Sequence, residues 1–69
     1  MKPQVFKHIE LTDTSPFSIE DAVNRAIKRA HETINKLCWF QLVDTCSHIV
    51  KGKIDNWQVT IKVGFVVEG

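Results

Sequence analysis

A single amphipathic helix, flanked on both sides by strand-like segments, narrows the folds available to this chain. Residues 19–37 carry apolar side chains every three or four positions, the spacing of one helical face. Ser18 suits the N-cap, and Asp21 stands three positions later, where a capping box usually has Glu or Gln. Small alanines in the stripe leave room for close packing on a sheet. The stripe consists of Ile19, Ala22, Val23, Ala26, Ile27, Ala30, Ile34 and Leu37.

Three other segments have the alternation of β-strands. Residues 57–68 form the clearest of them, and residues 4–12 and 39–50 are the other two. The last segment alternates between two sets of side chains, one of them wholly apolar. That apolar set is Trp57, Val59, Ile61, Val63, Phe65 and Val67.

Two polar segments separate these elements. Asp13-Thr14-Ser15-Pro16 is predicted to be a loop before the helix. Lys51-Gly52-Lys53, followed by Asp55-Asn56, is predicted to turn the chain into an antiparallel hairpin. The sequence therefore predicts one α+β domain over residues 1–69, with β-α-β-β order. Its three-stranded antiparallel sheet would be partly wrapped around the helix.

A chain of 69 residues needs more stabilisation than its own core supplies. Folding at this size buries only about 60% of the unfolded surface, and small domains often rely on disulfides, metals or partner subunits. Cys38 and Cys46 would lie about 26 Å apart on one extended strand, too far for a disulfide. One helix also covers only one face of the sheet. Oligomerisation is therefore the expected source of stability.

Charge and hydropathy exclude several classes of function. The net charge of +1 provides no basic field for nucleic acid. No apolar run approaches the roughly 18 residues of a membrane span, and the first residues lack the apolar stretch of a signal peptide. We therefore expect a cytoplasmic protein that binds neither nucleic acid nor membrane.

Two residues are candidates for recognising a planar ligand. An exposed Trp39 would offer a flat, electron-rich surface for stacking, whereas a buried one would belong to the core below the helix C-terminus. Gln58 carries an acceptor and two donors that suit a heterocycle with adjacent C=O and N–H groups. Its alternative interpretation is a solvent-facing strand residue.

Asp44, Cys46 and His48 share one face of the second strand if alternation is regular. Asp44 and His48 could hydrogen-bond the hydroxyls of a ligand, or the whole face could simply contact water. A zinc site is disfavoured because the spacing supplies only part of a tetrahedron. A reactive Cys46–His48 pair is the weaker enzymatic alternative. No Gly-rich phosphate loop occurs, so a binding protein is favoured over an enzyme.

The chain resembles the dodecin family along nearly its whole length. The resemblance lies in Leu37-Cys38-Trp39-Phe40 after the helix and in Trp57-Gln58-Val59 in the last strand. Thr14-Ser15, Arg29-Ala30 and Val63-Gly64-Phe65 add to it. Each motif is weak alone, but their order and spacing together are fairly specific.

The resemblance implies a small flavin-binding protein that assembles as a hollow homododecamer. Flavins would bind in pairs near twofold axes, stacked between tryptophans of two subunits, for storage and protection from light. By position, Trp39 matches the stacking residue, Gln58 the residue that bonds the ring edge, and Asp44 an aspartate near the ribityl chain. Cys46 and His48 are further candidates beside the ligand. The cofactor would be riboflavin or FMN, with FAD and lumichrome-like molecules as further options.

Several positions depart from the family pattern. Many bacterial members have Glu and Arg where this chain has Gln41 and Cys46. Some have an Arg that is linked to coenzyme A binding where this chain has Val66. Loss of both arginines weakens phosphate recognition, so riboflavin is expected at least as much as FMN, and coenzyme A is not expected. A module of the same fold without flavin is the main alternative.

One geometric question is left open by the sequence. Regular alternation places Trp39 and Asp44 on opposite faces of one strand. Both reach one ligand only if a bulge intervenes or if they come from different subunits.

Overall fold

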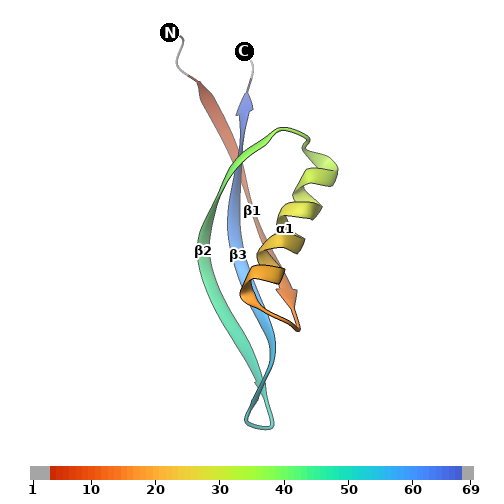
Figure 1. Cartoon of the computed structure of the whole chain (residues 1–69). Coiled ribbons are helices and arrows are strands. Elements are labelled where there is room, and N and C mark those ends of the chain that lie inside the picture. The colour runs from red at the N-terminus through yellow and green to blue at the C-terminus, as the bar shows by residue number, and fades with distance from the viewer. Residues whose placement is uncertain (1–3, 68–69) are drawn as a thin grey trace.

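Three long antiparallel strands and one helix make up the part of the chain that the structure describes (Figure 1). The computed structural model describes residues 4–67. The elements are β1 (Val5–Ser15), α1 (Ile19–Thr33), β2 (Leu37–Val50) and β3 (Lys53–Val67), in the sheet order β1-β3-β2. The predicted β-α-β-β order and the three-stranded antiparallel sheet are therefore confirmed. No helix within the described part is long and apolar enough to cross a membrane.

The predicted helix end was wrong by four residues. The helix ends at Thr33, and the C-cap Ile34 is already extended, at φ −124° and ψ 111°. Leu37 begins β2, pairs with Phe65 and packs against the core. The apolar spacing continued past the true end because residues that enter the sheet need apolar side chains as well.

The strands are longer than predicted at three ends. β1 continues through the predicted loop as far as Ser15, which pairs with Trp57. The hairpin turn is confined to Lys51 and Gly52, both with positive φ, at 53° and 76°. β3 therefore starts at Lys53 and includes Asp55-Asn56, which was predicted as turn. Polar sequence marks these stretches as loops, but cross-strand pairing overrides that local preference. Glu68, the predicted end of the last strand, lies outside the described residues.

A small hydrogen-bonded network holds the start of α1. The hydroxyl of Ser18 accepts from the backbone N–H of Asp21 at 2.9 Å, which confirms the predicted N-cap. The buried Ser15 donates to Asp21 Oδ2 at 2.5 Å and accepts from the backbone N–H of Phe17 at 3.0 Å. The bond from Ser15 is the main reason that the pKa of Asp21 lies below its ordinary value of 3.8; desolvation opposes it, and Arg25 adds to it.

The core lies between α1 and the middle strand. Among residues 4–67, six apolar residues are buried: three alanines of the helix and three residues of β3. The alanines let the helix approach closely, and each buried Val or Ile contributes about 1.5–3 kcal/mol. The helix packs on β1 and β3 and hardly touches β2. The core residues are Ala22, Ala26, Ala30, Val59, Ile61 and Val63.

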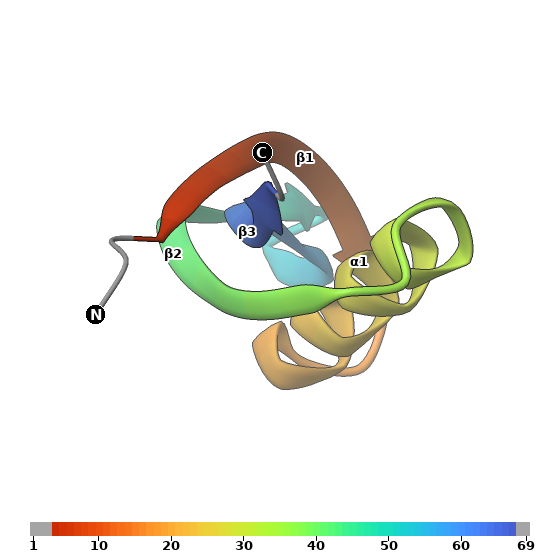
Figure 2. The ribbon, with the colours of Figure 1, turned by 90° about the horizontal axis from the view of Figure 1, so that it is seen from above.

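Much apolar surface lies outside this core. The chain measures 55 × 20 × 13 Å, and its radius of gyration is 14.5 Å, against about 11 Å for a compact domain of this length. The β2–β3 hairpin extends beyond the helix, and the sheet curls strongly when seen from above (Figures 1 and 2). Ile49 near the turn is 72% exposed. Such surface calls for a covering partner. The other exposed apolar residues of the hairpin include Phe40, Leu42, Val43, Val50 and Ile54.

Candidate functional site

The face of the sheet turned away from α1, here called the open face, carries the predicted site residues. Val59, Ile61 and Val63 are buried on the helix side, so the residues between them project to the other side. Directly paired residues of neighbouring strands share a face. On β3 and β2 the open face therefore comprises Asn56, Gln58, Thr60, Lys62, Gly64 and Val66 with Trp39, Gln41, Asp44, Cys46 and His48; on β1 it comprises Phe6, His8, Glu10, Thr12 and Thr14.

A β-bulge at Val43 brings Trp39 and Asp44 to the same face. Leu42 pairs with Ile61, whereas Asp44 pairs with Thr60, so β2 has one extra residue between the two pairs. An extra residue shifts the alternation of all that follows it by one position. Of the two alternatives that the sequence left open, the bulge is the one found within this chain.

The indole of Trp39 lies across β3 at Gly64. A β-carbon on Gly64 would overlap the indole, so the absence of a side chain is what admits the ring. Phe6 meets the indole edge to face, with 6.3 Å between ring centroids, and His8 lies tilted to it at 6.4 Å. Trp39 is 37% exposed and is therefore not the buried core residue of the alternative interpretation. Its free surface is available for stacking on a planar ligand.

Gln58 lies further along β3, toward the hairpin turn. It is paired directly with Cys46, and its Oε1 lies within hydrogen-bond distance of Nε2 of His48, at 3.0 Å. An amide oxygen only accepts, so this bond forms with the Nε2–H tautomer of His48 as the donor. Asn56 pairs with His48, and its buried Oδ1 has no hydrogen-bond partner within the described chain. The structure thus brings Gln58, Cys46 and His48 together.

A polar row lies between the indole and the Gln58 region. Asp44 pairs with Thr60, whose hydroxyl is 2.8 Å from that of Thr12. One carboxylate oxygen of Asp44 accepts from the backbone N–H of Thr45 at 2.9 Å. Carboxylate and hydroxyl groups in this row are suited to the hydroxyls of a polyol chain.

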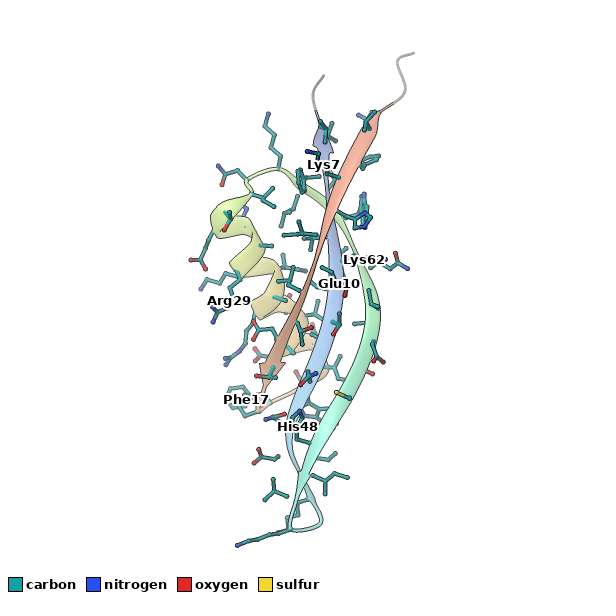
Figure 3. The ribbon with its side chains drawn as sticks, turned by 180° about the vertical axis from the view of Figure 1, so that it is seen from behind. Lys7, Glu10, Phe17, Arg29, His48 and Lys62 are labelled. Carbon is teal, nitrogen blue, oxygen red and sulfur yellow. The ribbon has the colours of Figure 1, made fainter. Side chains whose placement is uncertain are left out.

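The charge of the open face is slightly negative. Its described residues include two carboxylates, Glu10 and Asp44, and one ammonium group, Lys62. Glu10 and Lys62 are direct partners on neighbouring strands, and both are labelled on the sheet in Figure 3. This balance favours neutral ligands over phosphorylated ones.

Trp39 and Gln58 of one chain lie far apart along the open face. Trp39 pairs with Gly64, which stands six residues from Gln58 on β3. Six strand residues span about 20 Å, longer than a tricyclic heterocycle. Asp44, opposite Thr60, lies between the two. This separation along the backbone favours a ligand that contacts Trp39 of one copy of the chain and Gln58 of another.

The residues that sequence reasoning missed are those around the indole. Phe6, His8 and Gly64 were not proposed as site residues. The signal available for Gly64 was a glycine within a long alternating strand, which often marks close approach of another group. The positions of Phe6 and His8 beside the indole depend on the β1–β3 register, which no comparable sequence signal indicates.

Comparison with known proteins places the chain in one family. The sequence model of the family described as Dodecin matches residues 5–68. A curated relative, the dodecin of Thermus thermophilus, is 34% identical over 65 residues, covering 94% of both chains. The solved dodecin of Streptomyces coelicolor has a TM-score of 0.90 at 35% identity, covering 100% of this chain and 99% of its own.

Two further structures have the same fold. The dodecin of Streptomyces davaonensis has a TM-score of 0.88 at 32% identity, covering 99% of this chain and all of its own. A Mycobacterium tuberculosis protein, titled a calcium dodecin with a novel calcium-binding site, has a TM-score of 0.79 at 26% identity, covering 93% of this chain and 91% of its own. The chain belongs to the dodecin family, whose members are small binding and storage proteins, not enzymes.

Proposed function

We propose that this dodecin binds oxidised flavin non-covalently and stores it in a homododecamer. The observation that carries the proposal is the Trp39 indole, held over Gly64 on the open face with 37% of its surface exposed. The electron-rich indole would stack on the electron-poor isoalloxazine ring. Asp44, about four strand positions away, would meet the hydroxyls of the ribityl chain.

Stacking of this kind accounts for storage rather than turnover. An indole in contact with an excited flavin can transfer an electron to it quickly, which returns the flavin to its ground state. The bound flavin would lose both its fluorescence and its photochemistry. The protein would therefore protect the bound flavin from light and protect the cell from the photoproducts of flavin.

The assembly follows from two features of the single chain. The backbone span of about 20 Å between the Trp39 and Gln58 positions favours more than one copy at each ring. The exposed apolar side chains of the hairpin also need covering. A twofold axis would place two equivalent sites face to face, which suits stacked flavin pairs. The exposed free thiols of Cys38 and Cys46 fit the reducing cytoplasm.

Riboflavin is the ligand that we favour. The open face has one lysine against two carboxylates in its described part. Cys46 stands where many bacterial members of the family have arginine, and Val66 where some have it. A phosphate would approach a slightly negative surface without a bidentate partner. FMN should therefore bind more weakly than riboflavin. Calcium is not proposed, because no three His, Cys, Asp or Glu side chains of residues 4–67 form a group that could hold a metal ion.

A riboflavin titration tests the proposal directly. Flavin fluorescence is followed while the particle mass is measured by light scattering in the same buffer. Quenching that saturates near one flavin per subunit, on a particle of about twelve chains, is the expected result. Fluorescence that stays unchanged at micromolar protein would overturn the proposal and favour a structural module of the same fold.

A further inference from the structure

We infer that His48 is a positioning residue that fixes the orientation of the Gln58 amide, so that the site selects ligands with an imide-like edge. Such an edge has a carbonyl beside an N–H group. The inference rests on the proposed flavin site and names the chemical feature that this site reads. His48 acts through Gln58 in this scheme and need not touch the ligand itself.

The hydrogen bond between the two side chains is the starting point. His48 Nε2 and Gln58 Oε1 are 3.0 Å apart, and the residues stand on the adjacent strands β2 and β3. In Figure 3, His48 lies much nearer the hairpin turn than Lys62. The oxygen can only accept, so His48 donates from Nε2. With the proton on Nε2, a turned-over amide would set its NH₂ group against this N–H, and two donors would oppose each other. With the proton on Nδ1, the turned-over amide would instead donate to Nε2, so the proposed arrangement requires the Nε2–H tautomer of His48.

The bond therefore leaves one arrangement of free groups on Gln58. Oε1 has a second lone pair, and the NH₂ group has two hydrogens. An acceptor and a donor then lie side by side in a fixed order, which complements an N–H beside a carbonyl on the ligand. The N3–H and a neighbouring carbonyl of the isoalloxazine ring have this pattern.

The neighbours of Gln58 cannot easily replace His48. Cys46, its direct partner on β2, has a thiol that is only a weak donor. Asn56, opposite His48, turns its Nδ2 toward Asp55 at 3.5 Å. Without the imidazole N–H, the Gln58 amide would be free to rotate, and its pairing with the N3–H and one of the two flanking carbonyls would no longer be preorganised.

The test compares riboflavin with 3-methylriboflavin, which lacks the N3–H. Fluorescence titrations give both dissociation constants for wild type, His48→Phe and His48→Gln. Wild type should prefer riboflavin by about tenfold, and His48→Phe, which keeps a planar ring without a donor, should lose about three- to tenfold of that preference. His48→Gln supplies an amide N–H and should restore part of it. His31→Phe, on the helix and away from the open face, is the matched control and should behave as wild type.

A second measurement does not depend on flavin. Nitrogen NMR of the ligand-free protein reports which ring nitrogen of His48 is protonated. The Nε2–H tautomer of His48 is expected to predominate. Gln58→Leu removes the acceptor of this N–H and should lower the fraction of His48 in that tautomer. Light scattering of each variant checks that the assembly is intact.

The outcomes separate the two claims. If wild type does not quench riboflavin, the proposed function fails, and the inference fails with it. If riboflavin binds but His48→Phe keeps the full preference for it, only the inference is overturned. A ligand-free His48 protonated on Nδ1 alone would also overturn it.

Discussion

The indole of Trp39 occupies the space in which Gly64 would carry a β-carbon. The two residues are direct partners on adjacent strands, and the absence of a side chain on one sets the position of the ring on the other. Position 64 therefore belongs to the site although it offers no functional group.

Gly64→Ala should displace the indole and weaken riboflavin binding by at least about tenfold. The added methyl group also overpacks the sheet, so the free energy of unfolding should fall by about 1–3 kcal/mol. Both quantities are measured at one fixed protein concentration, because assembly couples stability to concentration.

The same substitution in a Trp39→Ala background separates the two causes. With the indole removed, Gly64→Ala should cost little stability, since the methyl group enters vacant space. An equal loss of stability in both backgrounds would show that the glycine is needed for the backbone and not for the indole.

Trp39→Ala should remove most of the flavin affinity and leave the particle mass unchanged. Loss of one stacking partner weakens binding by about 5- to 150-fold, from the 1–3 kcal/mol typical of base–aromatic stacking. Trp57→Phe is the matched control, because Trp57 belongs to the face of β3 opposite Gln58. Unchanged affinity in the Trp39 variant would remove the stacking role.

Asp44→Ala should weaken riboflavin binding by about tenfold, because a hydrogen bond to a charged group is lost. Lumiflavin, which has a methyl group in place of the ribityl chain, should bind the variant and the wild type equally. Calorimetric titration of both ligands distinguishes a contact with the chain from a general effect on the ring. Equal weakening of both ligands would contradict the assignment.

Asp21→Asn should lower stability at neutral pH and leave little difference in acid. The pKa of Asp21 is lowered in the folded chain, mainly by Ser15, so its carboxylate stabilises the fold above pH 3.8, the ordinary value. That stabilisation is lost as the pH falls below 3.8 through the lowered pKa. Denaturant unfolding at several pH values checks the trend, with the exposed Glu20→Gln as control. A difference that grows on acidification would contradict it.

Local sequence patterns predicted correctly those structural features that depend on residues close in sequence. The helix start was predicted correctly because Ser18, Asp21 and the first apolar residues of the stripe lie within two turns of each other. The helix end was not, because Leu37 follows a helical spacing yet pairs with Phe65 on a strand almost thirty residues later. The same long-range pairing extended β1 through Ser15.

The sequence by itself determined the order of elements, the helix-facing apolar set of β3 and the residue types available for stacking and hydrogen bonding. Only the tertiary structure decided which of them share a face. A bulge of one residue at Val43 aligns Asp44 with Trp39, and cross-strand register brings Phe6, His8 and Gly64 around the indole and His48 to Gln58. Side chains of a strand alternate with a period of two, so a single extra residue moves all following side chains to the opposite face. No local sequence pattern indicates at which position the strand pairing contains such an extra residue.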